Sequence, residues 1–328
     1  MISSGVRPFH DIFPPNMLPL GFGCGGLYGG ATRQDSLKLL ETAIDCGIRY
    51  FDTARLYGFG EAEGLLGEIA ARDRHRLIIT SKAGILPANR SIPIRLLNRA
   101  TRLLHKIPHA ARYIRAPAAA RLRFHVFSLP ELRASIQTSL KQLRTDYLDI
   151  LLLHECALAD IESGEILSFL ERLRSEGVIR AFGLATGIDE TQQIIASHPE
   201  LTRVVQIPNS MLDMNISRLP QRDDGLTILH SVLAGKIPAL LARLSTDAVF
   251  GTEFLAATGI DPRDRETIVQ LILSHALDCN SGGIVLFSSS KPSNIKSNMR
   301  VLQQPARDRH QIDSLASFFG SSASGDGA

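Results

Sequence analysis

Tyr147-Leu-Asp-Ile-Leu-Leu-Leu-His154 is a short, nearly continuous apolar run that ends in a histidine. Such a run is typical of a strand that is buried on both faces of a parallel sheet. Seven further stretches on either side of it have a similar character. The sequence therefore predicts eight strands, at residues 18–23, 48–52, 77–81, 147–154, 179–184, 203–207, 226–231 and 283–287.

The segments between these strands are amphipathic. Residues 36–46 place Leu37, Leu40 and Ile44 on one helical face, and residues 131–144 show the same spacing. Eight strands, each followed by helical sequence, predict an α/β fold of the (β/α)8 TIM barrel type. The alternative is a doubly wound open sheet, which normally carries a GxGxxG turn after an early strand. The glycine cluster at residues 21–26 does not have that spacing.

Composition limits the class of protein. The chain has 328 residues, of which 44% are hydrophobic and 21% are charged, as in an ordinary globular protein. We expect one catalytic domain over residues 1–319 and a disordered tail over residues 320–328. The apolar runs are too short to span a bilayer, and the N-terminus does not have the layout of a signal peptide. The four cysteines show no CxxC spacing, so we expect no metal site and a cytoplasmic location.

A long basic insertion is expected after the third strand, at residues 83–127. Residues 83–128 contain eight arginines, one lysine and no acidic residue, so they carry a formal charge of +9. Because the whole chain carries +3, the remaining residues sum to −6. This distribution argues against a nucleic-acid surface spread over the fold. Three interpretations stay open: a lid over the barrel, a site for an anionic substrate or carrier-protein partner, and contact with an anionic membrane surface.

Four polar residues stand at or just after predicted strand ends: Asp52, Tyr57, Lys82 and His154. Taken singly, each of them is more often a structural or solvated residue than a catalytic one. In a barrel, however, the C-terminal strand ends converge on one mouth, where barrel enzymes carry out their chemistry. The sequence therefore predicts an acid, a phenol, an amine and an imidazole around a single pocket.

This set matches the needs of carbonyl reduction. Hydride attack leaves negative charge on the carbonyl oxygen, and a proton donor must neutralise it. A free tyrosine has a pKa of about 10, and a nearby ammonium lowers that value. We expect Lys82 to act in this way on Tyr57, with Asp52 holding Lys82 charged. We expect His154 to orient the carbonyl.

The segment Phe51-Asp-Thr-Ala-Arg-Leu-Tyr-Gly-Phe-Gly-Glu-Ala-Glu-Gly-Leu-Leu-Gly67 closely resembles the aldo-keto reductase signature FDTAxxYGxGxSExxLG, with Ala62 in place of the usual serine. Other segments resemble further motifs of that family in the same order. They are ITSKAG (79–84), DYLDILLLH (146–154), GVIRAFGLATG (177–187), VVQIPNSML (204–212) and SSSKPSNIKSN (288–298). The resemblance implies that Asp52, Tyr57, Lys82 and His154 form the family's tetrad, with Tyr57 as general acid or base.

The resemblance also implies a nicotinamide cofactor bound across the barrel mouth. Gln206 matches the family's carboxamide-binding glutamine, and His230 stands where many members have an aromatic ring. Ala185 and Thr186 replace the usual Ser-Asn, so only Thr186 keeps a hydroxyl. The implied phosphate and adenosine contacts are Ser288, Ser289, Ser290, Lys291, Asn294 and Asn298. A basic residue at Lys291 favours NADP(H) over NAD(H).

The expected function is therefore the NAD(P)H-dependent reduction of an aldehyde or ketone, with Tyr57 as proton donor. One alternative is a dehydrogenase that oxidises a sugar lactol or a secondary alcohol. Another is a nicotinamide-binding regulatory protein with little turnover. The expected partner is a small carbonyl or alcohol substrate, and we expect neither nucleic acid nor a membrane-integral segment. The substrate, the physiological direction and the oligomeric state stay open.

Overall fold

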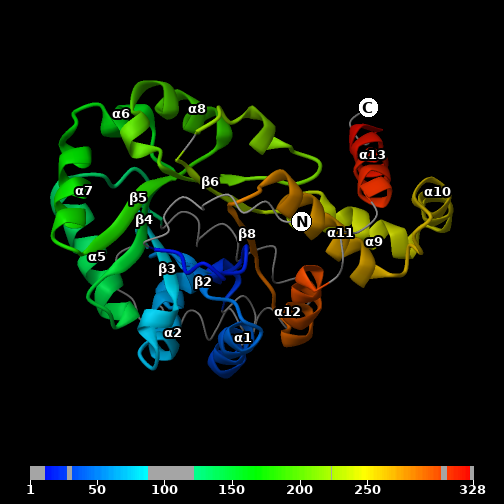
Figure 1. Cartoon of the computed structure of the whole chain (residues 1–328), viewed down its shortest axis with the longest axis horizontal. Coiled ribbons are helices and arrows are strands. Elements are labelled where there is room, and N and C mark those ends of the chain that lie inside the picture. Colours follow the sequence, from blue (N-terminus) through cyan, green and yellow to red (C-terminus); the bar gives the residue numbers. More distant parts are fainter. Residues whose placement is uncertain (1–11, 28–31, 88–121, 223, 304–308, 326–328) are drawn as a thin grey trace.

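Eight parallel strands close into a barrel in which each strand pairs with the next and β8 pairs with β1. The structure is a computed structural model that describes residues 12–27, 32–87, 122–222, 224–303 and 309–325. Figure 1 shows the strands around the centre of the molecule with helices outside them. The strands are β1 (Leu20–Gly23), β2 (Tyr50–Asp52), β3 (Ile78–Ala83), β4 (Leu148–His154), β5 (Ile179–Ala185), β6 (Val204–Pro208), β7 (Leu226–His230) and β8 (Ile284–Phe287).

All eight predicted strands are present, so the predicted (β/α)8 barrel is confirmed. The bounds shift by one or two residues where local turns intervene. Strand β2, for example, begins at Tyr50 rather than at residue 48. Gly47 and Ile48 still belong to the turn that ends the preceding helix, because their N–H groups donate to the carbonyls of Ile44 and Ala43. Gly47 has a φ of +91°, which suits glycine at a helix end.

Helices connect the strands and cover the outside of the barrel. They are α1 (Arg33–Asp45), α2 (Ala62–Ala70), α5 (Leu129–Leu143), α6 (Leu158–Ile161), α7 (Glu165–Ser175), α8 (Ile188–Ser197), α9 (Ile237–Thr246), α10 (Ala248–Thr258), α11 (Arg265–Cys279), α12 (Pro292–Met299) and α13 (Arg309–Gly325). Helix α1 begins with a capping box, in which Thr32 and Asp35 satisfy each other's backbone N–H groups. In the parts of the chain that the structure describes, no helix is long and apolar enough to cross a membrane.

The interior of the barrel is a packed core rather than a pore. Inward-facing side chains such as Tyr50, Ile150 and Ile228 are fully buried. The N-terminal residues Ile12, Phe13 and Met17 belong to the same apolar cluster, and the ring of Phe13 stacks on that of Tyr50 with centroids 6.2 Å apart. Tyr50 is the first residue of its strand, so this segment packs at the end of the barrel where strands begin. That end is therefore sealed, and any open site must lie at the other end.

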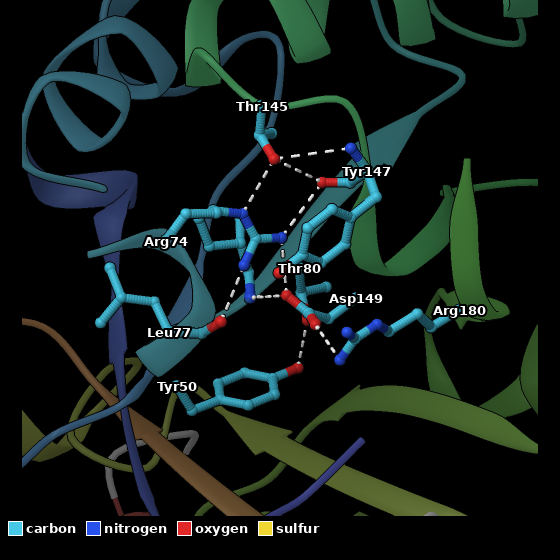
Figure 2. A network of polar contacts seen from close by, with 9 residues as sticks. Tyr50, Arg74, Leu77, Thr80, Thr145, Tyr147, Asp149 and Arg180 are labelled. Atoms are coloured by element: carbon cyan, nitrogen blue, oxygen red, sulfur yellow. Dashed lines mark hydrogen bonds and ion pairs between the residues drawn. The ribbon is translucent and has the colours of Figure 1, made fainter. Parts of the chain in front are cut away.

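A network of ion pairs ties together the strand starts (Figure 2). The carboxylate of Asp149 is fully buried; it accepts hydrogen bonds from Arg74 at 2.8 Å, from Arg180 at 3.2 Å and from the backbone N–H of Ile79 at 2.9 Å. The ring of Tyr147 lies between the guanidinium groups of Arg74 and Arg180, at 4.0 and 4.8 Å from its centroid. Arg74 also donates to Thr145 and to two backbone carbonyls. The network therefore links β3, β4 and β5 at the sealed end.

The C-terminal helices form a second apolar cluster beside the barrel. Helices α9, α10, α11 and α13 lie together at one edge of the molecule (Figure 1), with Phe254 and Phe319 fully buried between them. Helix α13 continues to Gly325. The expectation of disorder from residue 320 is therefore wrong for residues 320–325, because burial of Leu315 and Phe319 against this cluster anchors the helix. Residues 326–328 lie outside the described residues.

The two ends of the predicted basic insertion lie side by side. Leu86 and Arg123 exchange backbone hydrogen bonds of 2.9 and 3.0 Å as an isolated antiparallel bridge. Phe127 packs against Gly84, where an added Cβ would approach the Phe127 ring to 2.3 Å. The insertion therefore leaves and rejoins the barrel at one point, just after β3. Its central part, residues 88–121, lies outside the described residues, so the predicted lid and anionic-partner roles stay predictions.

Candidate active site

The structure brings the side chains of Asp52, Tyr57 and Lys82 together at the C-terminal end of the barrel. Lys82 Nζ lies 2.7 Å from both carboxylate oxygens of Asp52 and 3.1 Å from the carbonyl oxygen of Thr53. Lys82 Nζ also donates to the hydroxyl oxygen of Tyr57, at 3.2 Å. Lys82 and Asp52 are only 2% and 3% exposed. Because Lys82 donates to the phenol oxygen, the phenolic proton is left for another acceptor.

Local structure sets these positions. Asp52 ends β2, Lys82 is the penultimate residue of β3, and Tyr57 begins a short 3₁₀ turn (Tyr57–Gly60) after β2. In that turn the Tyr57 N–H donates to the carbonyl of Ala54. Neighbouring parallel strands end at the same edge, so Asp52 and Lys82 meet across the β2–β3 pairing.

His154 completes the group. It is the last residue of β4, and its ring packs edge-on against the Tyr57 ring, with centroids 6.1 Å apart and an interplanar angle of 87°. Burial, then the charge of Lys82 and then His230, lower the pKa of His154 to about 3. His154 is therefore neutral at physiological pH. A neutral imidazole can donate one hydrogen bond to a carbonyl oxygen without adding a charge.

The electrostatics of Tyr57 differ from the expectation. Burial raises its pKa above the usual 10.0, while the charge of Lys82 acts in the opposite direction without overcoming burial. Burial also lowers the pKa of Lys82, but the charge of Asp52 and the hydrogen bonds outweigh this effect and leave its pKa raised. Lys82 therefore remains an ammonium, and Tyr57 remains a protonated phenol.

A cavity of about 280 Å³ lies over these residues, and Gln206, His230 and Ser288 line it as well. Gln206 Nε2 donates to Asp52 at 3.0 Å. Among the described residues, nothing bonds Gln206 Oε1, although this atom is buried. A buried carbonyl oxygen without a donor is unusual and indicates a missing partner. A ligand that carries an amide N–H group would satisfy it. We refer to this space as the inner cavity.

The two residues that replace the usual Ser-Asn, Ala185 and Thr186, differ in their surroundings. Ala185 lines the inner cavity, but Thr186 does not. The hydroxyl of Thr186 shares a 2.6 Å hydrogen bond with that of Thr191, which in turn donates to the carbonyl of Gly187. The one hydroxyl expected to replace the Ser-Asn pair is therefore already engaged within the protein.

The predicted phosphate segment follows β8. Ser288 donates from its hydroxyl to the carbonyl of Gly23 at 2.7 Å. The hydroxyl of Ser289 accepts from the Lys291 N–H and donates to the Lys291 carbonyl, which shapes the turn that opens α12. Ser290, Lys291 and Asn294 are exposed, whereas Asn298 is buried. The exposed side chains and the start of α12 are thus accessible to an anion.

A second, larger cavity of about 750 Å³ opens beside the inner one, and we call it the outer cavity. Its apolar wall consists of Leu56, Ile85, Leu122 and Phe124. The last two come from the C-terminal end of the basic insertion, so the insertion contributes to the site. Leu122 and Phe124 were not predicted from the sequence, because the insertion is not similar to the family's motifs. Glu155, which directly follows His154, was not predicted either.

Comparisons with known proteins agree with this geometry. A sequence model of the aldo/keto reductase family matches residues 19–229. D-threo-aldose 1-dehydrogenase from a Pseudomonas species is 30% identical over 188 residues, which cover 52% of this chain and 50% of that protein. The NADH-specific methylglyoxal reductase of Escherichia coli is 27% identical over 221 residues, covering 64% and 61% of the two chains. This chain spans about half the length of the first curated relatives that it matches.

Solved structures share the fold. An aldo-keto reductase from Klebsiella pneumoniae, solved in complex with NADPH, superposes with a TM-score of 0.61 at 18% identity. The superposition covers 93% of this chain and 92% of that one. At this level of identity the likeness supports the barrel architecture, and the site chemistry rests on the residues described above.

Proposed function

This chain belongs to the aldo/keto reductase family, and we propose that it reduces a small aldehyde or ketone to the alcohol, with NAD(P)H as the cofactor and Tyr57 as the proton donor. The observation that carries the proposal is the position of Lys82. Its ammonium is held by both oxygens of Asp52 at 2.7 Å and lies 3.2 Å from the Tyr57 hydroxyl, at the mouth of the barrel.

The proton step follows from these contacts. Tyr57 is protonated at neutral pH, since even an ordinary phenol is, and burial raises its pKa further. When its proton passes to the substrate oxygen, the phenolate that remains is stabilised by the Lys82 ammonium, which already donates to that oxygen. Asp52 keeps Lys82 charged and fixed in place, so little reorganisation accompanies the transfer.

His154 orients the substrate in this proposal. Its ring lies beside that of Tyr57 and lines both cavities. Because its pKa is lowered to about 3, it acts as a neutral hydrogen-bond donor and not as the acid. Tyr57 is therefore the only one of these two groups that supplies the proton.

The inner cavity fits a nicotinamide. Its orphaned Gln206 Oε1 would accept from the carboxamide, and His230 would lie against the ring. A bound nicotinamide supplies the hydride. We propose Ser288, Ser289, Ser290, Lys291, Asn294 and Asn298 as contacts for the rest of the cofactor. Ala185 offers no hydroxyl, and that of Thr186 is engaged by Thr191, so the carboxamide would be held mainly by Gln206.

We propose NADP(H) rather than NAD(H), because Lys291 is exposed beside the start of α12. The relatives do not decide this point, since the Escherichia coli relative is named NADH-specific and the Klebsiella structure contains NADPH. KM values for NADPH and NADH, measured with one aldehyde, test it. Lys291→Ala should raise the KM for NADPH and leave that for NADH unchanged. A lower KM for NADH in the wild type would contradict the proposal.

The decisive experiment follows NADPH and NADH absorbance with a panel of aldehydes, ketones and quinones. The wild type is compared with Tyr57→Phe, which keeps the ring and removes the proton. Turnover should fall by about 10²–10⁴-fold in the variant. Both proteins should still bind the cofactor, which a fluorescence titration measures. Cofactor binding without turnover in either protein would contradict the reductase proposal.

A second candidate is the reverse reaction. The 30% identity to a protein named D-threo-aldose 1-dehydrogenase favours oxidation of a sugar lactol. Tyr57 would then act as the base, with Lys82 stabilising the phenolate in the same way. Assays with NADP⁺ or NAD⁺ and a set of aldoses distinguish the two directions.

A further inference from the structure

Only three described residues line both the inner and the outer cavity, and they are Tyr57, His154 and Glu155. Tyr57 and His154 belong to the proposed proton and orientation machinery. Glu155 is the third, and the reaction proposed above gives it no role. Because all three line both cavities, a substrate that spans the two cavities at Tyr57 also meets this carboxylate.

The backbone at Glu155 is in an uncommon conformation. Its φ of +51° is left-handed, a region that favours glycine and, among other residues, asparagine. The N–H of Glu155 donates to the carbonyl of Ala185 at 2.9 Å, which ties the turn after β4 to the end of β5. Strained non-glycine residues of this kind cluster at ligand sites, because surrounding structure must hold them there. Glutamate at this position is therefore not explained by the turn itself.

The carboxylate of Glu155 has no hydrogen-bond or ion-pair partner among the described residues. The outer cavity contains two further carboxylates, but both are engaged: Asp189 pairs with Arg218, and Glu190 accepts from the N–H of Leu158 at 2.7 Å. The charge of His125 acts on Glu155, but the short contact of the His125 ring, 2.9 Å, is with Asp160. Among the described residues that line either cavity, Lys82 is the only lysine or arginine, and Asp52 neutralises it.

We propose that Glu155 determines substrate specificity, accepting a hydrogen bond from a hydroxyl or ammonium group on the part of the substrate that extends from the reacting carbonyl into the outer cavity, and excluding substrates with a carboxylate there. This inference rests on the proposed reductase function. Glu155 is exposed where the two cavities meet, and a negative charge at that place repels an anion and attracts a cation. The apolar wall of Leu56, Ile85 and Phe124 would contact the hydrocarbon part of the same substrate.

The test uses three aldehydes with the same reacting group and different charge. They are 4-(dimethylaminomethyl)benzaldehyde, which is cationic at neutral pH, neutral 4-methylbenzaldehyde, and anionic 4-carboxybenzaldehyde. The wild type should show a kcat/KM for the cation at least about tenfold above that for the anion. Glu155→Gln should bring this ratio to within about threefold of unity, and Glu155→Lys should invert it. Glu162→Gln, an exposed change of equal charge outside both cavities, should keep the wild-type ratio.

A second variant separates specificity from folding. Glu155→Gly removes the carboxylate and also suits the left-handed φ, so it should raise the melting temperature while it abolishes the charge preference. A merely structural Glu155 would not change the ratio in this way. An unchanged ratio in Glu155→Gln, or a wild-type preference for the anion, would overturn the inference.

Binding decides the inference separately from turnover. Titration calorimetry with cofactor present measures the Kd of the benzyl alcohols that correspond to the cationic and the anionic aldehyde. In the wild type the cationic alcohol should have a lower Kd than the anionic one, and in Glu155→Gln the two Kd values should be equal. If no aldehyde is turned over but this preference holds, the reductase proposal fails and the role of Glu155 stands. If the aldehydes are turned over but neither kcat/KM nor Kd depends on charge, the reductase proposal stands and the role of Glu155 is overturned. If neither the cationic nor the anionic alcohol bound at millimolar concentration, the inference would also be overturned.

Discussion

The two ends of the barrel each contain a buried carboxylate paired with a basic side chain, but they differ in what surrounds the pair. At the sealed end, both oxygens of Asp149 are bonded, and each nitrogen of the Arg74 guanidinium has an acceptor (Figure 2). At the mouth, the Asp52–Lys82 pair borders a cavity, and the buried atoms Gln206 Oε1 and Thr53 Oγ1 have no partner among the described residues. A network in which every polar group is hydrogen-bonded stabilises the fold. A network that leaves buried polar atoms without a partner offers them to a ligand.

The largest effect should come from breaking the sealed end. Asp149→Asn leaves Arg74 and Arg180 without their shared carboxylate, and we expect it to lower the free energy of unfolding by about 3 kcal/mol. The kcat of the folded variant should stay within about twofold of the wild type, because the network does not reach the mouth. Urea unfolding and steady-state assays measure the two quantities.

Two controls sharpen this prediction. Glu171→Gln removes an exposed ion pair with Arg174 and should change the unfolding free energy by less than about 0.5 kcal/mol. Tyr57→Phe should lose turnover and keep the unfolding free energy within about 1 kcal/mol. If Asp149→Asn abolished activity at full stability, the division between the two ends would be wrong.

An effect of intermediate size concerns pH. Burial, then Lys82 and His230, hold the pKa of His154 at about 3, against an ordinary value of 6.5. The unfolded chain therefore binds a proton below about pH 6.5 that the folded chain does not bind, so acidification destabilises the fold. His154 should contribute a slope of about 1.4 kcal/mol per pH unit below that value. His154→Gln should flatten the dependence of unfolding free energy on pH between about 6 and 5.

The same pKa has a kinetic consequence. Because His154 stays neutral over the assay range, kcat/KM should show no inflection near pH 6.5. An inflection there that disappeared in His154→Gln would show that His154 titrates at an ordinary pKa in the working enzyme.

The smallest expected effect is on cofactor binding at the inner cavity. Ala185→Ser restores a hydroxyl at the inner cavity and should tighten NADPH binding by about 1 kcal/mol, or roughly fivefold. Thr186→Val removes a hydroxyl that is already bonded to Thr191, so it should change the Kd by less than about twofold. Fluorescence titration measures both. A larger loss in Thr186→Val would place Thr186 against the cofactor after all.

Much of this molecule was predictable from sequence because its signals are local. Buried parallel strands appear as apolar runs whichever partner they pair with, and residues at their C-terminal ends meet at the mouth of any such barrel. The positions of Asp52, Lys82 and His154 followed from this rule. The regulatory alternative loses support for the same reason, since the structure brings Asp52, Tyr57, Lys82 and His154 together at one mouth.

Other features depended on contacts between distant segments. The residues from 320 onward are small and polar, and this composition predicts disorder. Helix α13 nevertheless continues to Gly325, because Phe319 is buried against Phe254 of α10 and anchors it. The hydroxyl of Thr186 is directed to Thr191, and the position of Glu155 between two cavities depends on the left-handed turn that directly follows β4. No local pattern in the chain signals these arrangements.

By itself, the sequence determined the eight strands, the family and which residues stand at the strand ends, because periodicity and motif spacing are properties of the chain. Only the tertiary structure decided the electrostatics of the site. Burial raises the pKa of Tyr57 although Lys82 acts against it, lowers that of His154 to about 3, and leaves Gln206 Oε1 without a donor. These properties depend on how much water is excluded and on which charges face each other, and both are set when the strands close into the barrel.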